Sequence, residues 1–239
     1  MKIAIDQPNY IPWKGYFDLI HDVDLFIFYN DVQYTTRDWR NRNIIITPNG
    51  EKWLTVPVGK KTHRLICDVK MEDDSWQRNH YETIKYSYGK APHFVEYKDF
   101  FEDCYLGRKW EYLYELDQYL TVEISRKFLG IKTEFADSRD FETHGVKHER
   151  LLSLIESVGG VSVYESGPTA KDYIIPEDYK ARGIGLCWKS YADYPEYPQS
   201  GEQFNHYVSI LDLLFNTGAD APYYIWGWRE ETGEQSFIY

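Results

Sequence analysis

Polar and aromatic side chains crowd one short stretch near the start of the chain, from Gln7 to Tyr16. Aromatic rings can stack on a base or a sugar, and amide groups can hydrogen-bond the edge of either. A glycine in the same stretch lets a ligand come close to the backbone. The candidate ligand-binding residues here are Gln7, Asn9, Tyr10, Trp13, Gly15 and Tyr16.

A second polar group lies between Asp31 and Asn43. Amide N–H groups can stabilise an oxyanion, and a guanidinium can hold an anionic group. The alternative for each residue taken singly is a turn cap or a solvated surface position. The candidate ligand-binding residues of this group are Gln33, Tyr34, Arg42 and Asn43, and the candidate oxyanion donors are Asn9, Asn41 and Asn43.

Three residues are candidates for a catalytic base that takes a proton from an attacking amine: Asp31, His63 and His80. His63 lies in a polar segment, whereas His80 lies in a predicted helix, where a histidine is more often a surface or core residue. No triad spacing selects among the three. No metal-ligand spacing is present either, so the sequence predicts neither a metal site nor a cofactor.

A third informative stretch runs from Glu165 to Ile174 and follows a predicted strand. Ser166 can donate to a phosphate oxygen, Gly167 allows close approach, and Lys171 supplies a positive charge. The alternative is a capped turn with a solvated lysine. Because the stretch follows a strand, we expect Ser166, Gly167 and Lys171 to bind phosphate.

The spacing of apolar residues indicates which elements position these groups. A short apolar run at 3–5 and a second at 25–29 flank a segment, 16–23, whose apolar residues recur three and four apart. This order predicts a strand, a loop, a helix and a parallel strand. The loop would then lie at the carboxyl edge of the sheet, where such sheets bind ligands, and the helix amino end beyond it favours an anion.

The same reasoning predicts the fold of the remaining chain. A hairpin around Asn49-Gly50 is expected to extend the sheet or to fold over the pocket. The tail 226–230 is expected to be loosely held. The sequence predicts an α/β, Rossmann-like fold: a mostly parallel sheet with flanking helices, an inserted hairpin and a helical segment. We expect one domain, 1–239, in which a helical region at about 75–130 forms a subdomain. Further strands are expected at 43–47, 52–58, 131–135, 161–164 and 183–189, and helices at 75–88, 110–129, 147–158 and 208–217.

Composition excludes several classes of function. The formal net charge of -11 argues against general nucleic-acid binding, although a local basic strip remains able to hold a small phosphorylated ligand. No stretch is apolar enough for a membrane span, and the start lacks the layout of a secretory signal, so a cytoplasmic location is expected. The three cysteines are far apart and predict ordinary free thiols. The basic strip comprises Arg37, Arg40, Arg42, Lys60, Lys61, His63 and Arg64.

The chain resembles the WbqC family over nearly its whole length, in the ordered segments QPNYIPWKGYFDLI, FYNDVQYTTRDWRNRN, WLTVPV, YGKAPHF, YESGPTAKDYI, YPQ and SILDLLFN. Members of that family are typically encoded with bacterial surface-polysaccharide enzymes. The resemblance implies modification of a nucleotide-linked sugar, namely transfer of an acyl or aminoacyl group to an amino sugar, as in O-antigen biosynthesis. The implied partner is a small molecule.

A weaker resemblance links the first loop to the HxGH nucleotidyltransferases. Gly15 matches the glycine of that motif, whereas Trp13 and Tyr16 stand where its histidines would be. An indole and a phenol cannot act as cations toward a transferred phosphate. Two alternatives to the transferase therefore stay open: a non-catalytic binding or assembly protein on a degenerate nucleotidyltransferase fold, and an active nucleotidyltransferase that uses other residues.

Overall fold

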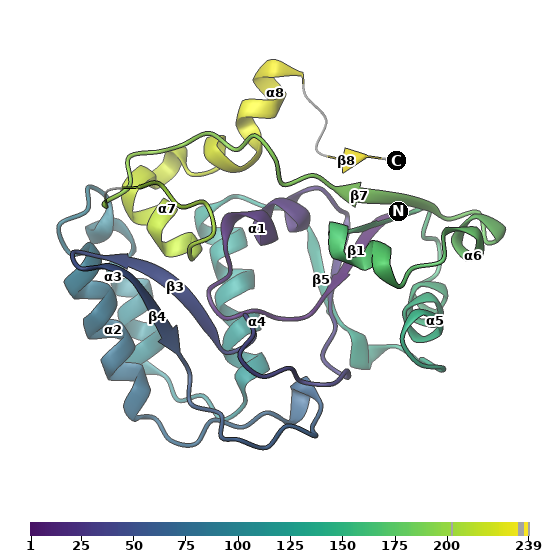
Figure 1. Ribbon diagram of the computed structural model, residues 1–239, viewed down its shortest axis with the longest axis horizontal. Coiled ribbons are helices and arrows are strands. Elements are labelled where there is room, and N and C mark those ends of the chain that lie inside the picture. Colours follow the sequence, from purple (N-terminus) through teal and green to yellow (C-terminus); the bar gives the residue numbers. More distant parts are fainter. Residues whose placement is uncertain (202, 234–236, 239) are drawn as a thin grey trace.

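A six-stranded sheet in the order β5-β2-β1-β6-β7-β8 organises the chain, as a computed structural model shows (Figure 1). The structure describes residues 1–201, 203–233 and 237–238. The first five strands in this order are parallel, and β8 is antiparallel to β7. The predicted fold class is confirmed. The strands are β1 (Lys2–Asp6), β2 (Leu25–Phe28), β5 (Glu134–Asp137), β6 (Val163–Ser166), β7 (Gly185–Lys189) and β8 (Phe237–Ile238).

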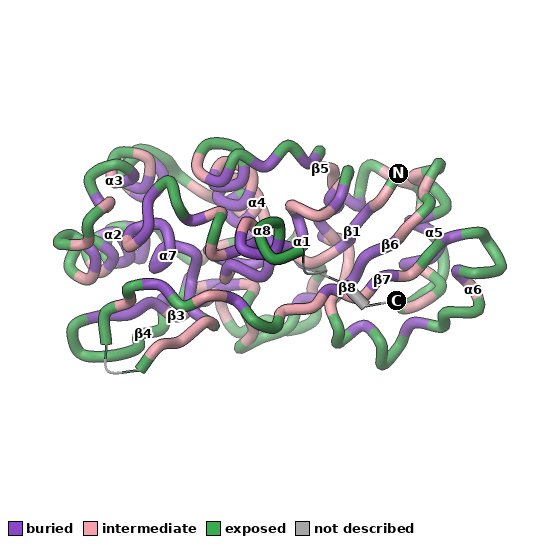
Figure 2. Tube along the Cα trace, turned by 90° about the horizontal axis from the view of Figure 1, so that it is seen from above, coloured by how far each residue is buried: buried purple, intermediate pink, exposed green. Residues whose placement is uncertain are grey.

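Both faces of the parallel sheet are covered, because alternate side chains of each strand enter different hydrophobic clusters. Ile3 and Ile5 of β1 pack in the cluster that contains α5 (His148–Val158), whereas Ala4 packs in the cluster that contains α1 (Lys14–His21) and α4 (Leu113–Glu123). In β2 the same alternation puts Ile27 on the α5 side and Phe26 on the other. Figure 2 shows mostly buried residues along β1 and α1 and mostly exposed ones around α6 (Pro176–Ala181).

The predicted hairpin is present as β3 (Arg42–Thr47) and β4 (Gly50–Thr55). It closes where Thr47 pairs with Gly50, whose φ of 97° is a conformation that glycine adopts readily. The expectation that it extends the central sheet is wrong, because the two strands form a sheet of their own. The hairpin packs instead against helices, and Tyr88 at the end of α2 (Ser75–Tyr88) accepts a hydrogen bond from the backbone of Ile46.

Helices on the far side of the molecule from α5 and α6 share a core with the sheet (Figure 1). The predicted helix 110–129 is α4 followed by a wider helical turn, η3 (Ile124–Phe128). No helix within the described residues is long and apolar enough to cross a membrane. The other helical elements are η1 (Ile66–Asp68), α3 (Phe94–Glu102), η2 (Asp103–Gly107), η4 (Ser138–Asp140), η5 (Pro168–Asp172), α7 (Ile210–Thr217), η6 (Gly218–Asp220), η7 (Tyr223–Gly227) and α8 (Trp228–Thr232).

The expectation of a loosely held tail at 226–230 is wrong. Trp226, Trp228 and Arg229 are buried, with 8%, 7% and 6% of their surface exposed. Arg229 pairs with Asp18 of α1, a contact between positions far apart in the sequence that local pattern cannot reveal.

Candidate functional site

The strand order creates a crevice between β1 and β6. From β1 the chain proceeds outward through β2 to β5, and it then returns across β1 to build β6 and β7 on the other side. In open α/β sheets ligands bind beyond the carboxyl ends of the strands at such a switch point. A cavity of about 890 Å³ lies there, within the usual size range of small-molecule sites.

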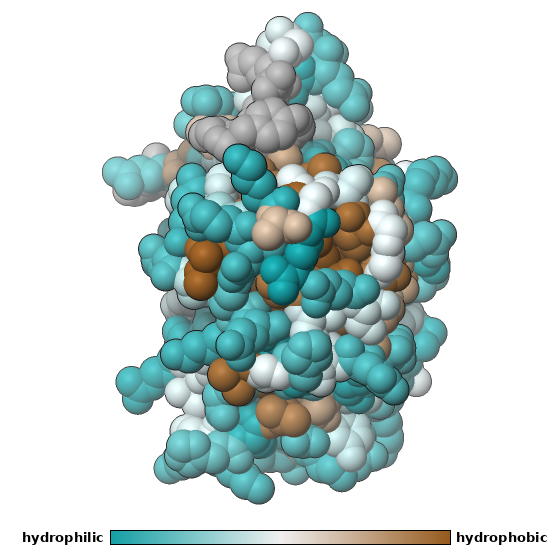
Figure 3. All heavy atoms as spheres, turned by 90° about the vertical axis from the view of Figure 1, so that its right-hand side faces the viewer, coloured by the Kyte–Doolittle hydropathy of each residue, from teal (hydrophilic) through white to brown (hydrophobic). Residues whose placement is uncertain are grey.

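The cavity is largely apolar and contains a few charged groups, as small-molecule sites commonly do. We call it the crevice. Figure 3, which faces the α5 and α6 end of the molecule, shows a hydrophilic surface with hydrophobic residues recessed within it. The crevice is lined by Ile5, Asp6, Gln7, Tyr29, Asp31, Val32, Gln33, Leu65, Gly145, Val146, Lys147, Arg150, Leu151, Tyr164 and Tyr173.

Asp6, the last residue of β1, brings a carboxyl group to the floor of the crevice. Burial raises the pKa of this carboxyl, and the nearby Arg40 guanidinium and the backbone N–H of Gln7 only partly oppose that effect. A carboxylate with a raised pKa at a binding crevice is a candidate general base. The sequence analysis missed Asp6, although a signal existed: it is the first charged residue after the apolar run 3–5.

Asp31 lies in the crevice as expected, and both oxygens of its carboxylate accept hydrogen bonds from other residues. Ser138 donates its hydroxyl to one carboxylate oxygen at 2.5 Å, and Arg150 donates to the other. Arg150 lies in the first turn of α5, and its Nε is buried with no hydrogen-bond partner in the described part of the chain. The ion pair fixes the guanidinium at the wall of the crevice, beside Lys147. Sequence reasoning missed Arg150, because helical periodicity does not reveal which helix faces a strand end.

Arg40 positions the first loop. Its Nε donates to the side-chain oxygen of Gln7 at 2.6 Å, and its Nη1 donates to the side-chain oxygen of Asn9. Gln7 lines the crevice, whereas Asn9 lines a second cavity, so Arg40 lies between the two. The sequence analysis placed Arg40 only in a basic strip.

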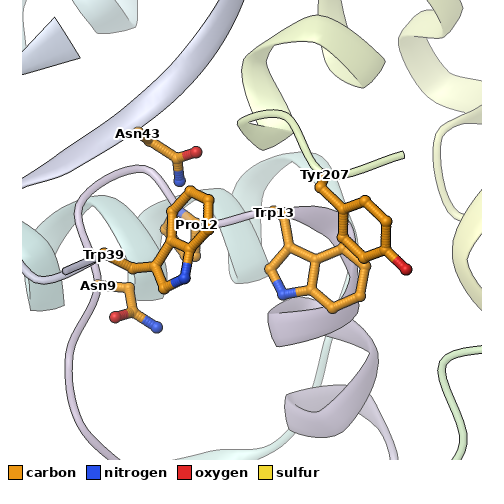
Figure 4. A pocket seen from close by; sticks show the side chains of 6 residues that line it. All are labelled: Asn9, Pro12, Trp13, Trp39, Asn43 and Tyr207. Atoms are coloured by element: carbon orange, nitrogen blue, oxygen red, sulfur yellow. The ribbon is translucent and has the colours of Figure 1, made fainter. Parts of the chain in front are cut away.

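The second cavity, of about 190 Å³, is walled by aromatic rings, and we call it the aromatic pocket (Figure 4). The Trp13 and Tyr207 rings lie 5.2 Å apart between centroids. Asn43 braces the loop above by donating to the backbone oxygens of Tyr10 and Ile11 at 3.1 and 2.9 Å. The aromatic pocket is lined by Asn9, Pro12, Trp13, Trp39, Asn43 and Tyr207, of which Asn9, Trp13 and Asn43 were predicted to bind ligand.

Gly15 is approached closely by the chain itself. A Cβ added at Gly15 would lie 2.3 Å from an atom of the Trp13 indole. The space expected for a ligand at the amino end of α1 is therefore filled by Trp13. The Tyr16 hydroxyl donates to the backbone oxygen of Gln7 at 3.0 Å and so supports the loop.

The two candidate histidines lie apart from the crevice lining. His63 is exposed on the loop after β4. His80 is buried on α2, where its Nδ1 is 2.8 Å from the Tyr10 hydroxyl, which in turn is 2.5 Å from the Tyr105 hydroxyl. Burial lowers the pKa of His80 to about 4, so its ring is neutral near pH 7. Tyr10 and His80 thus form a buried polar cluster.

The remaining predicted residues are dispersed. Gln33 lines the crevice, whereas Tyr34 is buried and Arg42 stacks on Trp53 at 4.2 Å from the ring centre. Ser166 is buried, and its hydroxyl accepts a hydrogen bond from the Tyr164 hydroxyl at 3.3 Å.

Gly167 approaches the Tyr191 hydroxyl, which would lie 3.6 Å from an added Cβ. Lys171 lies over the Trp188 ring at 5.4 Å, and it is Tyr173, not Lys171, that lines the crevice. No cluster of three or more His, Cys, Asp or Glu that could hold a metal occurs among the residues the structure describes.

Comparison with known proteins places the chain beside a protein family and a relative of similar length. The model of a family described as the WbqC-like protein family matches residues 7–224. A protein of Mycobacterium tuberculosis (strain ATCC 25618 / H37Rv), described as "Uncharacterized protein Rv1507c", is 42% identical over 226 residues, which cover 94% of this chain and 97% of the relative. No solved structure gives a significant match. The matched range contains both cavities apart from the β1 residues Ile5 and Asp6.

Proposed function

The chain belongs to the WbqC-like protein family, and on that premise we propose that it is a transferase that places an acyl or aminoacyl group on a nucleotide-linked amino sugar in bacterial surface-polysaccharide biosynthesis. The crevice is its active site. The observation that carries the proposal is the Asp6 carboxyl, whose pKa is raised by burial, at the switch point of the sheet and in the same crevice as Lys147 and Arg150. Three free cysteines suit the reducing cytoplasm in which the enzyme would act.

Asp6 is the proposed base. The sugar amine attacks the carbonyl carbon of an activated acyl donor, such as a thioester. The N–C bond forms, the bond from the acyl carbon to the leaving group breaks with its electron pair, and the amine proton passes to Asp6 and then to the leaving group. Because its pKa is raised toward neutral pH, the Asp6 carboxylate is a better proton acceptor than an ordinary aspartate.

Arg150 is the proposed stabiliser of the negative charge that develops on the acyl oxygen. Its guanidinium is fixed by Asp31, and a pre-positioned cation in a largely apolar crevice stabilises an oxyanion strongly. Asp31 then has a positioning role rather than that of a base, because both of its oxygens already accept hydrogen bonds.

The alternative of phosphoryl chemistry at the first loop has less support. The Trp13 indole covers Gly15, which is where a helix amino end would otherwise meet a phosphate. A non-catalytic binding protein remains the second candidate, since no serine, threonine or cysteine is among the described residues that line the crevice.

The test compares Asp6→Asn with Asp99→Asn, a matched change at an exposed carboxylate on α3. Purified protein is incubated with nucleotide-linked amino sugars and acyl thioesters, and product is measured by mass spectrometry. Asp6→Asn is expected to lower turnover by about 10² or more while substrate affinity is kept, and Asp99→Asn is expected to have no effect. Binding of the sugar nucleotide without product for any donor would favour the binding protein, and release of pyrophosphate would favour a nucleotidyltransferase.

A further inference from the structure

We propose that the aromatic pocket is a nucleobase subsite that selects a pyrimidine with two ring carbonyls, uracil or thymine. The inference deepens the proposed function, because it rests on a nucleotide-linked substrate and names the nucleotide. It concerns binding, so it is testable without any acyl transfer.

Two indole N–H groups face one another across the pocket. Trp13 and Trp39 both line it, and Figure 4 shows their ring nitrogens on the sides that face each other. Neither N–H donates to another residue in the part of the chain that the structure describes. An indole N–H can only donate, so each requires an acceptor from a ligand or from water.

Asn9 supplies a third donor. Its side-chain oxygen accepts a hydrogen bond from Arg40, which determines the orientation of the amide. The amide nitrogen is therefore the atom left for the pocket, and Figure 4 shows it on the Trp13 side.

The acceptors around the pocket are already engaged. The side-chain oxygen of Asn43 accepts from the backbone of Ile44 at 2.8 Å. The backbone oxygens of Pro12 and Trp39 accept from the amides of Ile210 and Tyr10 at 2.8 and 3.0 Å. The Tyr207 hydroxyl points away from the pocket (Figure 4). The pocket thus presents several donors and few free acceptors.

Size and shape restrict the ligand to one flat ring. The volume of about 190 Å³ is below the range of sites that enclose a whole drug-sized ligand. Its walls are indole rings, a proline and a tyrosine, which favour stacking. Uracil and thymine carry one carbonyl oxygen on each side of the ring N3–H, and these two oxygens match donors that lie on opposite sides of the pocket, while the N3–H between them is left to water. Cytosine has an amino group in place of one of these carbonyls, so on that side a donor would meet a donor.

The two cavities suit the two ends of one substrate. Arg40 hydrogen-bonds Gln7 of the crevice and Asn9 of the aromatic pocket. With the base in the aromatic pocket and the sugar in the crevice, the diphosphate passes the Arg40 guanidinium, a good partner for phosphate oxygens.

The experiment measures binding of UMP and CMP to the full chain by calorimetry at one fixed salt concentration. UMP is expected to bind about tenfold more tightly than CMP, because an unpaired polar group at a buried edge costs that much affinity. Trp39→Phe and Trp13→Phe keep a ring but remove one donor each, so each is expected to weaken UMP binding about fivefold. The variant that loses the donor to the carbonyl that cytosine lacks is expected to leave CMP binding unchanged, so the two variants together lower UMP affinity more than CMP affinity. Trp53→Phe is the matched control, because Trp53 packs on Trp39 at 5.3 Å but does not line the pocket.

A variant that places an acceptor where Asn9 has a donor gives a second test. Asn9→Asp replaces the donor with a carboxylate oxygen and is expected to shift preference toward CMP. Thermal unfolding of each variant verifies that it is folded. Equal binding of UMP and CMP by the wild type, no binding of either, or equal losses of UMP and CMP affinity in both tryptophan variants would overturn the subsite. Uridine selectivity without acyl transfer would retain the subsite and reject the proposed reaction, whereas acyl transfer to cytidine-linked and uridine-linked sugars alike would do the reverse.

Discussion

Arg229 donates to both carboxylate oxygens of Asp18, at 2.8 and 2.5 Å, although the two residues are 211 positions apart in the sequence. Lys189 at the end of β7 adds a contact of 2.9 Å to the same carboxylate, and the Tyr194 hydroxyl donates to it at 2.5 Å. Asp18 is fully buried. One carboxylate therefore joins α1, β7, α8 and the loop that carries Tyr194.

Replacing Asp18 with alanine is expected to lower the free energy of unfolding by about 3–5 kcal/mol, because the buried Arg229 would lose its main partner, whereas Lys189 would keep Asp22 at 2.6 Å. Urea unfolding measures the loss. Asp172→Ala, at an exposed position, is the control and should change stability by less than about 0.5 kcal/mol. A loss below about 1 kcal/mol for Asp18→Ala would show that the network is weakly coupled to folding.

His80 predicts a specific acid sensitivity. Burial lowers its pKa from 6.5 to about 4. Below pH 6.5 the His80 ring therefore binds a proton in the unfolded chain but stays neutral in the folded chain. Stability is therefore lost as the pH falls from 6.5 to about 4, by up to about 3 kcal/mol from this residue. His80→Asn keeps an acceptor for Tyr10 but does not titrate. The difference in unfolding free energy between wild type and variant should follow this window; a constant difference would contradict the assignment.

Lys14 predicts a dependence of the same sign in alkali. Burial lowers its pKa from 10.5 to about 8, which the nearby Asp18 only partly opposes, and its ammonium lies 4.7 Å from the centre of the Tyr194 ring. Between pH 8 and 10.5 the unfolded chain holds the proton and the folded chain does not, so this residue adds stability as the pH rises. Lys14→Met should remove that slope and be neutral or stabilising at pH 7. Destabilisation at pH 7 by more than about 1 kcal/mol would indicate that the charge itself is needed.

Under the proposed reaction, Asp6 sets the acid limb of activity. The base must be deprotonated, so kcat/KM should fall as the pH drops through the pKa of Asp6, which burial places above the ordinary value of 3.8. The Arg40 charge lowers that pKa, and Arg40→Gln should therefore move the inflection to higher pH. The pH profile of kcat/KM for both proteins provides the measurement. An inflection that stays in place, or moves to lower pH, would argue that another group is the base.

The elements that local pattern encodes were predictable. The unit of β1, α1 and β2 follows from the apolar runs and the helical spacing between them, and the hairpin follows from Asn49-Gly50. The contacts that complete the site could not be predicted from local pattern. The partners in Asp31–Arg150 and Arg40–Gln7 are far apart in the chain, and their pairing depends on how helices and loops pack on the sheet. The prediction that a ligand approaches Gly15 failed for a similar reason. A glycine indicates that another group comes close to the backbone, but it does not reveal that this group is the Trp13 side chain.

β1 is made before the other described strands of the sheet, yet it lies inside the sheet, between β2 and β6. β1 can pair with β2 on one side soon after synthesis, but its other edge stays unpaired until β6, which begins at Val163, has been made. Until then an apolar strand has an open edge, the kind of surface that recruits other chains. We therefore expect nascent chains that end before Val163 to depend on chaperones, and the finished chain to lose that dependence.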